Sequence, residues 1–372
     1  MIPVNVPLLD GNEALYVQQC ISSGWLSSEG EFVGRFEQAM AERLDRRHAV
    51  AVSNGSAALD VAISALGIGP GDEVILPTHT IISCASAVVR AGARPVLVDS
   101  DALSWNMDVG RIEAALTART RAIMVVHIFG LPTDMDPVMK LARENGLLVI
   151  EDAAQAIGQT YKGRPCGSFG DISCLSFYSN KHITTGEGGM VLCNDEAICE
   201  RARSLRNLCF MSHRRFVHEE LGWNYRMSNL QAAVGLAQLE QLEAHVARKK
   251  RMGERYQELL RDVDGLELPL ASLPYAANNY WVFGLVLKDD VSGCADDARA
   301  RLHECGVETR PFFWPMHEQP VFQKMGLFPN GSYPVAERMG RRGFYLPSGL
   351  ALSSEQQIEI ADAVQRMMER VL

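Results

Sequence analysis

Short apolar segments rich in β-branched residues alternate with amphipathic segments along the first half of the chain. The apolar segments predict strands at residues 48–53, 73–77, 94–99, 122–127, 147–152, 172–177 and 188–193. Helical periodicity separates the first five of them, at residues 56–67, 81–92, 109–118 and 137–146. Apolar strands between amphipathic helices indicate an α/β fold with a mainly parallel sheet that is covered on both faces. The last two strands follow each other without a helix, so we expect the sheet to be mixed there.

The pattern changes after residue 228. Apolar positions at helical spacing predict a long helix over residues 229–263. A strand at residues 279–287 and a helix near residues 295–304 follow. The last segment, from residue 353, opens with a serine cap candidate and predicts another helix. This mixture is typical of a smaller α+β unit.

The chain has 372 residues, which suits two domains. We predict a large α/β domain with a seven-stranded sheet flanked by helices at residues 1–245, and a small α+β domain at residues 246–372. Hydrophobic residues make up 47% and charged residues 22% of the chain, as in soluble globular proteins. The net charge of −9 argues against a nucleic acid or an anionic membrane as a partner.

The nine cysteines include no CxxC pair, and the first residues lack the pattern of a secretory signal. No apolar run approaches the roughly 20 residues that span a bilayer. We therefore expect a cytoplasmic protein with reduced thiols.

The sequence Asn54-Gly55-Ser56 stands between a predicted strand and a predicted helix. Backbone N–H groups at a helix start, together with the helix dipole, favour an anion such as a phosphate. Gly55 would allow close approach, and Ser56 would add a hydroxyl group. The alternative is an ordinary helix start with Ser56 as the N-cap residue.

Asp152 ends the apolar strand at residues 147–152, and Lys181 follows it by 29 residues. Ligands gather at the carboxyl ends of strands in open α/β sheets. A buried carboxylate there needs a cationic or hydrogen-bonding partner, and a desolvated lysine becomes a nucleophile that can form a Schiff base. The alternatives are a capping role for Asp152 and an exposed position for Lys181.

Pyridoxal phosphate requires all three features at once. Its aldehyde reacts with a lysine, its ring nitrogen pairs with an acid, and its phosphate needs an anion site. An ionic N–H···O contact is roughly twice as strong as a neutral one, so Asp152 would hold both the protonation state and the orientation of the ring. We predict pyridoxal phosphate as the cofactor and assign no metal ligands.

Several longer stretches occur at the spacing of a known family. They are SNGSAAL, GIGPGDEVILPT, VHIFGLPTDMDP, VIEDAAQAIG, LSFYSNKHITTGEGGM and GWNYRMSNLQAAVGLAQL, and TRPFFWPMH and LPSGLALS extend the match into the predicted small domain. The chain resembles the DegT/DnrJ/EryC1/StrS sugar aminotransferases. This resemblance implies the fold of fold-type I pyridoxal-phosphate enzymes and a homodimer with shared active sites.

The resemblance also implies a role for each matching residue. Lys181 would bind the cofactor aldehyde and then act as acid and base in the proton shift, and Asp152 would pair with the ring nitrogen. Gln155 would contact the ring hydroxyl group, and Asn224 would reach the phosphate that the neighbouring subunit binds. The residues implied to hold the phosphate within the subunit are Gly55, Ser56 and Ser176.

Two positions complicate the family pattern. Family members often carry an aromatic residue that stacks on the cofactor ring where this chain has Ile81, so either Ile81 or the nearby His79 would serve. A related subfamily of dehydratases has a histidine in place of the lysine, and His182 directly follows Lys181. Ser176, five residues before Lys181, and the ITTGEGG stretch after it favour Lys181 as the Schiff-base residue, and hence transamination.

The resemblance implies amino transfer from L-glutamate to the C4 ketone of a nucleotide-linked 4-keto-6-deoxysugar. The whole-chain similarity favours GDP-4-keto-6-deoxy-D-mannose, with a product destined for O-antigen or another surface polysaccharide. A TDP or UDP sugar, a C3 ketone and a dehydratase reaction stay open as alternatives. Because guanidinium groups suit diphosphates, Arg214 and Arg215 are also considered, with solvent exposure as the alternative. The candidate substrate-binding residues are Trp25, Ser27, Arg226, Arg310, Trp314 and His317.

Overall fold

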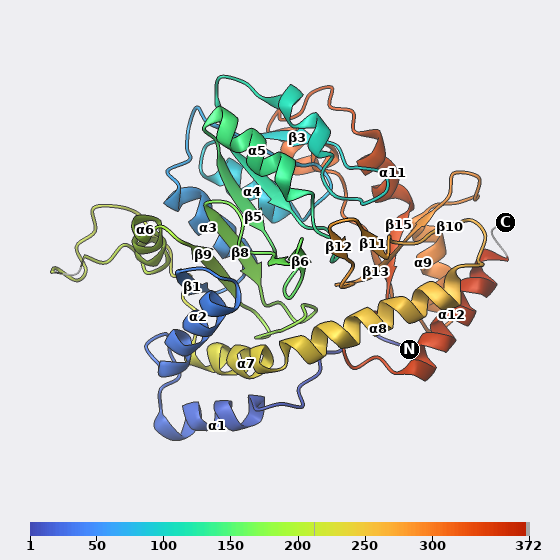
Figure 1. Ribbon diagram of the computed structural model, residues 1–372, viewed down its shortest axis with the longest axis horizontal. Coiled ribbons are helices and arrows are strands. Elements are labelled where there is room, and N and C mark those ends of the chain that lie inside the picture. Colours follow the sequence, from blue (N-terminus) through green and yellow to red (C-terminus); the bar gives the residue numbers. More distant parts are fainter. Residues whose placement is uncertain (212, 370–372) are drawn as a thin grey trace.

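The computed structural model describes residues 1–211 and 213–369. The strands at its centre are β1 (His48–Val52), β2 (Glu73–Pro77), β3 (Arg94–Val98), β4 (Thr120–Val126), β5 (Leu148–Asp152), β8 (Ile172–Ser176) and β9 (Gly189–Cys193). They form one seven-stranded sheet in the order β1-β9-β8-β5-β4-β2-β3 (Figure 1). All seven predicted strands are confirmed, and so is the α/β fold class.

The directions of the strands also agree with the prediction. β3, β2, β4, β5 and β8 are parallel to one another. β9 pairs antiparallel with both β8 and β1, so the sheet is mixed at this end. The parallel strands bring the residues after their carboxyl ends to one edge of the sheet.

Helices cover both faces of the sheet (Figure 1). The helices on one face are α3 (Gly55–Ala65), α4 (Ile82–Arg90) and α6 (Glu196–Arg206), and those on the other are α2 (Glu31–Arg43), α5 (Met135–Asn145) and α7 (Asn229–Glu240). Within β2, Val74 and Leu76 belong to the first core and Ile75 to the second. This alternation explains why the strands are apolar at every position.

The prediction of a helix at residues 109–118 is wrong. The chain forms two short 3-10 turns there, η1 (Val109–Arg111) and η2 (Glu113–Ala115). The Asp108 side chain accepts a hydrogen bond from the N–H of Gly110 at 3.1 Å, and a glycine this early weakens a helix. Ile112 is the one fully buried residue of this short segment, so packing does not compensate.

The long helix predicted over residues 229–263 divides at Gln241 into α7 and α8 (Leu242–Leu260). α8 carries the chain from the large sheet to the C-terminal elements (Figure 1). The predicted domain boundary after residue 245 therefore falls within the first turn of a continuous helix. The division into two domains remains a prediction.

A second sheet lies in the C-terminal part of the chain. Its strands, in spatial order, are β10 (Leu266–Glu267), β13 (Phe283–Leu287), β15 (Gly343–Leu346) and β14 (Arg310–Pro311). The helices around it are α9 (Ala295–Glu304), α11 (Pro334–Arg342) and α12 (Ser354–Met368), and the side chain of Ser353 caps α12. Phe312, Phe322 and Met339 belong to the core of the large sheet, so the two parts of the chain pack closely together.

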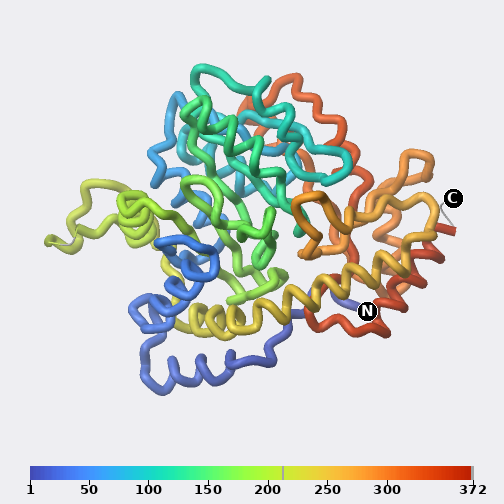
Figure 2. The backbone as a smooth tube through the Cα atoms, viewed as in Figure 1, coloured from blue at the N-terminus to red at the C-terminus, as the bar shows by residue number. Residues whose placement is uncertain are grey.

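The remaining elements are α1 (Glu13–Ser23), β6 (Thr160–Tyr161), β7 (Arg164–Pro165), β11 (Ser272–Leu273), β12 (Ala276–Ala277), η3 (Met316–Glu318) and α10 (Pro320–Lys324). Figure 2 shows the segment between α6 and α7 extending away from the rest of the chain. Within residues 1–211 and 213–369, none of the helices has the length and apolar character needed to cross a membrane.

Candidate active site

The principal candidate residues gather at the carboxyl edge of the parallel strands. Asp152 is the last residue of β5, and Ser176 is the last residue of β8. Gly55 is the first residue of α3, the helix that follows β1. Lys181 lies in the irregular segment after β8. Ligands bind at this edge in α/β proteins of this type.

Asp152 is buried, with 3% of its surface exposed. Its Oδ1 accepts a hydrogen bond from the N–H of Ala154 at 3.0 Å, and its Oδ2 accepts one from the thiol of Cys84 at 3.3 Å. Burial raises the pKa of Asp152, and the contact with Ala154 opposes this. The hydrogen bond from Ala154 uses one carboxylate oxygen, so Asp152 can cap this turn and bind a cation at the same time. Such a carboxylate gains from a cationic partner such as a protonated ring nitrogen.

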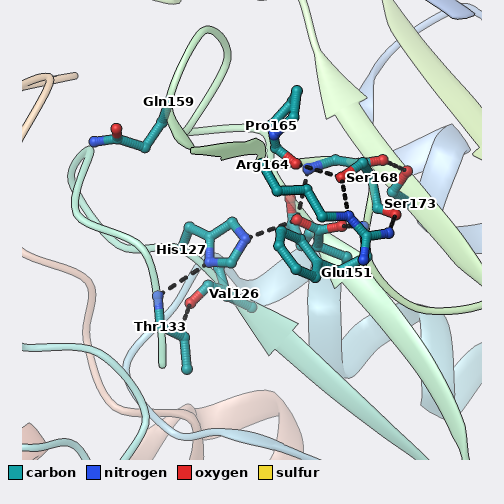
Figure 3. A network of polar contacts seen from close by, with 12 residues as sticks. Val126, His127, Thr133, Glu151, Gln159, Arg164, Pro165, Ser168 and Ser173 are labelled. Carbon is teal, nitrogen blue, oxygen red and sulfur yellow. Dashed lines mark hydrogen bonds and ion pairs between the residues drawn. The ribbon is translucent and has the colours of Figure 1, made fainter. Parts of the chain in front are cut away.

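Glu151 precedes Asp152 in β5, so its side chain points to the opposite face of the sheet. Figure 3 shows it in a buried polar network. Glu151 accepts hydrogen bonds from the N–H of Gly167 at 2.5 Å and from His127 Nε2 at 2.9 Å. His127 Nδ1 accepts one from the N–H of Thr133 at 3.1 Å, so the ring proton is on Nε2. This network holds the end of β5, and therefore Asp152, in place.

Lys181 is partly buried, and its amine lies 3.8 Å from the ring centroid of Trp281. The indole N–H of Trp281 donates to the carbonyl oxygen of Asn180 at 2.9 Å, which ties the ring to the residue before the lysine. Desolvation lowers the pKa of Lys181 to about 7, and attraction to Asp152 opposes this. An amine with this pKa can act as nucleophile, acid and base near neutral pH. Lys181 is therefore not an ordinary exposed lysine.

Gly55 and Ser176 lie against each other where α3 starts. A Cβ atom at Gly55 would be 2.8 Å from Ser176 Cβ and 3.2 Å from Ser176 Oγ, so only glycine fits. The hydroxyl of Ser56 is 2.7 Å from that of Ser83 in α4. The helix start and the three hydroxyl groups form a cradle with the donors that a phosphate needs.

Asn54, and not Ser56, is the N-cap residue of α3. Its side chain accepts a hydrogen bond from the N–H of Ala57 at 2.8 Å. The alternative in which Ser56 caps this helix is therefore wrong. A cap at Asn54 leaves the hydroxyl of Ser56 available for a ligand.

Gln155 is buried, and its Oε1 accepts a hydrogen bond from the N–H of Phe129 at 2.9 Å. Its amide NH2 group consequently points the other way as a donor. His79 is completely buried among aromatic rings, with ring centroids 5.9 Å from Phe129 and 5.8 Å from Phe313. Ile81 is 40% exposed at the start of α4, so it is the one of the two stacking candidates that offers open surface.

Asn224 and Arg226 lie in the segment between α6 and α7. Asn224 is exposed, and its main chain forms an isolated bridge with Asn207. Arg226 Nη1 donates to the side-chain oxygen of Asn207 at 2.6 Å, and the main chain of Arg226 bridges that of Val52. Val52 ends β1, so this bridge brings Arg226 to the strand that precedes the phosphate cradle. Arg214 and Arg215 lie farther out in the same segment and are exposed.

Trp25 and Ser27 are exposed in the loop between α1 and α2. Asn229 fixes this loop, because its side chain donates to the carbonyl oxygen of Trp25 at 2.7 Å and its N–H donates to that of Ser27 at 2.9 Å. The side chains of Trp25 and Ser27 are therefore presented on the surface of a held loop.

The candidates of the C-terminal part differ in their surroundings. Arg310, in β14, is exposed. Trp314 is 43% exposed, and the guanidinium carbon of Arg341 lies 5.3 Å from its ring centroid. His317 is 6% exposed, and its two ring nitrogens contact Thr78 Oγ1 at 3.3 Å and Glu337 Oε1 at 3.1 Å. In this arrangement His317 joins the two parts of the chain, and neither of its nitrogens is free for a ligand.

The sequence interpretation overlooked Trp281 and Cys84. Trp281 was part of the predicted strand at residues 279–287, although β13 begins only at Phe283. A tryptophan two residues after an asparagine pair, just before a strand, is the one local signal that could have drawn attention to it. Cys84 lies on a helix with no motif, so only the tertiary structure brings its thiol to Asp152.

These residues fit pyridoxal phosphate. The cradle at Gly55 and Ser176 suits the phosphate, the carboxylate of Asp152 suits the ring nitrogen, and the amine of Lys181 suits the aldehyde. Asp152 and Lys181 attract each other electrostatically, which opposes the effect of burial on the pKa of each.

Comparisons with known proteins agree with this arrangement. The chain is 41% identical over 363 residues to GDP-perosamine synthase from Escherichia coli O157:H7, with 98% of this chain and 97% of that protein covered. It is 41% identical over 368 residues to GDP-perosamine synthase from Caulobacter vibrioides, with 99% and 98% covered. The crystal structure of the aminotransferase TlmJ from Streptoalloteichus hindustanus superposes with a TM-score of 0.92 at 32% identity, covering 100% of this chain and 99% of that one.

The family model of the DegT/DnrJ/EryC1/StrS aminotransferases matches residues 7–365, and this range contains every residue of the candidate site. The chain therefore belongs to the DegT/DnrJ/EryC1/StrS aminotransferase family and is a pyridoxal-phosphate-dependent transaminase.

Proposed function

We propose that this enzyme transfers the amino group of L-glutamate to the C4 ketone of GDP-4-keto-6-deoxy-D-mannose and so produces GDP-perosamine. The observation that carries this proposal is the 41% identity, over nearly the whole length, to two proteins named GDP-perosamine synthase. The product would serve O-antigen or another surface polysaccharide. The near-neutral amine of Lys181 supports transamination over the histidine-dependent dehydration considered above.

Pyridoxal phosphate, when bound, supplies an aldehyde that carries the amino group and a ring that accepts electrons. Lys181 holds and moves a proton at Nζ, because its pKa of about 7 allows both protonation states near neutral pH. Asp152 keeps a proton on the ring nitrogen, because a buried carboxylate is stabilised by a cation. Gln155 donates from its NH2 group to the ring hydroxyl group, with its Oε1 held by Phe129.

The phosphate is held at the start of α3. Gly55 leaves the room for close approach, and Ser56 and Ser176 donate hydroxyl hydrogens. We assign no role in stacking to His79, because its ring is enclosed by other aromatic side chains. Ile81 is the residue that we propose packs against the cofactor ring.

The nucleotide sugar needs cationic and aromatic partners outside this cofactor site. We propose Arg226 and Arg310 for the diphosphate, because both are charged and Arg226 adjoins the strand before the phosphate cradle. Trp25, Ser27 and Trp314 are exposed and would contact the sugar or the base. His317 is proposed only as an indirect contributor, because Thr78 and Glu337 occupy its ring nitrogens.

We further propose a homodimer with shared active sites. The segment between α6 and α7 extends from the body of the chain (Figure 1), and it exposes 75% of Phe216 and 94% of Leu221. Exposed apolar side chains on an extended segment favour a protein partner. Asn224 lies in the same segment, where it would reach the phosphate bound by a second copy. All nine cysteines are free thiols, which supports a cytoplasmic location.

The proposed reaction is tested with purified protein supplied with pyridoxal phosphate and L-glutamate. GDP-, TDP- and UDP-linked 4-ketosugars are added separately, and the amino sugar and 2-oxoglutarate are quantified by mass spectrometry. We expect both products in equal amounts with the GDP sugar. Products with a TDP or UDP sugar alone would exclude GDP-perosamine, and a dehydrated sugar without 2-oxoglutarate would exclude transamination.

A further inference from the structure

Lys249 is a second buried lysine close to Lys181. It lies in α8 with 2% of its surface exposed. Its amine donates to the main-chain carbonyl oxygen of Trp281 at 2.7 Å and to that of Ser348. An apolar side chain of similar volume would fill this space without the cost of burying an amine. Lys249 therefore needs an explanation beyond packing.

α8 contacts the surroundings of Lys181 from two successive turns. His245 and Lys249 are four residues apart and so lie on one face of the helix. His245 Nδ1 donates to the carbonyl oxygen of His182 at 3.0 Å, and Lys249 holds the main chain of Trp281. The ring of Trp281 in turn faces the amine of Lys181 at 3.8 Å. One helix face thus fixes both the residue after the lysine and the ring that covers it.

We propose that Lys249 is a positioning residue for Lys181: it holds the main chain at Trp281 and so keeps the indole ring against the reactive amine. This inference rests on the proposed function of Lys181. The titratable groups that face Lys181 or Trp281 in this region are Asp152, His182, Lys249 and Tyr345, whose ring centroid lies 6.4 Å from that of Trp281.

The protonation behaviour of the two lysines agrees with this role. Burial lowers the pKa of Lys249 to about 7, and the charge of Lys181 contributes to the lowering. Desolvation is the largest cause of the low pKa of Lys181. If the Trp281 ring is no longer held, water reaches the Lys181 amine. Hydration then stabilises the protonated amine, so the pKa of Lys181 rises. Loss of the neighbouring positive charge acts in the same direction.

The test titrates Lys181 in the protein without cofactor. Competitive acetylation with acetic anhydride is carried out over a series of pH values, and the labelled Lys181 peptide is quantified by mass spectrometry. We expect a midpoint at about 7 in the wild type. In Lys249→Met the midpoint should rise by at least ~1 pH unit. Trp281→Phe should raise it too, and the double variant should raise it little further than Lys249→Met alone, since both changes release the same ring.

Tyr256→Phe is the matched control. It removes another buried hydrogen bond of α8, from the Tyr256 hydroxyl to the carbonyl oxygen of Pro347 at 2.9 Å, next to the Ser348 carbonyl that Lys249 contacts. It should lower Tm and leave the Lys181 midpoint unchanged. If Lys249→Met behaves like this control, Lys249 is only structural and the proposal fails. Should Lys249→Met not fold, Lys249→Gln, which keeps one donor but no charge, is judged by the same midpoint.

The experiment uses neither cofactor nor substrate, so an error in the assigned sugar would not affect it. A wild-type midpoint near that of an ordinary lysine would contradict the proposed function of Lys181 itself. A midpoint near 7 that Lys249→Met leaves in place would contradict only the role of Lys249.

Discussion

Lys181 and Asp152 both lie where removal from water disfavours their charged form. Burial lowers the pKa of Lys181 and raises that of Asp152, and the attraction between the two residues only partly offsets this. A protein does not gain stability from this arrangement, because each charge costs free energy when it is removed from water. Under the proposed function, Asp152 would gain a cationic partner at the ring nitrogen of pyridoxal phosphate, and Lys181 would hold the aldehyde.

Lys181→Ala should abolish transamination, because the variant lacks both the nucleophile and the acid and base. We expect 2-oxoglutarate production to fall by more than about 10²-fold, the lower range for loss of a general acid or base. Lys162→Ala, a change of an exposed lysine that pairs with Asp136 on the surface, is the control and should keep normal activity. Near-normal turnover in Lys181→Ala would refute the assignment.

Asp152→Asn should separate stability from activity. Because the folded-state pKa of Asp152 lies above its unfolded value, its contribution to stability is fully present below pH ~4 and is lost as pH rises through the folded pKa. Without cofactor, the wild type should lose up to about 1.4 kcal/mol of unfolding free energy per pH unit in that window.

Asp152→Asn should lack this slope and should lose most of its activity, since it cannot hold the proton on the ring nitrogen. Urea unfolding over a pH series, with turnover measured in parallel, checks both outcomes. An identical pH slope in the two proteins would contradict the buried state of this carboxylate.

At the scale of elements, the start of α3 packs against the end of β8, and this contact forms the proposed phosphate cradle. Asn54 caps the helix, which leaves the hydroxyl groups of Ser56 and Ser176 beside its first N–H groups. The close packing of the two elements at Gly55 sets the size of the cradle. Any side chain there would separate the helix from the strand.

Gly55→Ala should destabilise the protein by about 1–3 kcal/mol, as overpacking does, and should weaken cofactor binding. The reason is the 2.8 Å approach of the added Cβ to Ser176 Cβ. Gly34→Ala, in an exposed position of α2 with nothing within 4 Å, is the control and should stabilise by about 0.5–1 kcal/mol. Thermal unfolding and titration with pyridoxal phosphate measure both effects, and unchanged binding in Gly55→Ala would rule out the cradle.

At the scale of the whole molecule, a single copy of the chain leaves large apolar side chains exposed on its surface. Phe216 and Leu221 are exposed on the segment between α6 and α7, which extends away from the rest of the chain (Figure 2), and Asn224 follows them in the sequence. The residues proposed as catalytic, in contrast, are held by contacts within one chain. A second copy would therefore complete the site at its phosphate end and leave Lys181 unchanged.

Leu221→Asp should convert the proposed homodimer into monomers, because a charge replaces a leucine that is 94% exposed in the single chain. Sedimentation velocity measures the assembly, and turnover should fall with it. Leu103→Asp, at another leucine that is 70% exposed, should change neither property. A wild-type protein that sediments as a monomer would refute the dimer.

Local patterns sufficed for most of the fold. The seven strands were predicted to within two residues at each end, because continuous apolar runs do not depend on which strands become neighbours. The pattern failed at residues 109–118, where a helical period occurs but Gly110 and the cap at Asp108 prevent a helix. It also missed the break at Gln241, since α7 and α8 share one period.

The sequence alone determined which candidate residues occur and in which order: a glycine at a helix start, an acid at a strand end and a lysine among small residues. These depend on residues close in sequence. The pKa of Lys181 was determined by the tertiary structure alone. Trp281 and Lys249 lie 100 and 68 residues from Lys181 in the sequence, and they reach it only through the packing of α8 against the loop before β13. Desolvation is a property of everything that surrounds a group, so no local pattern encodes it.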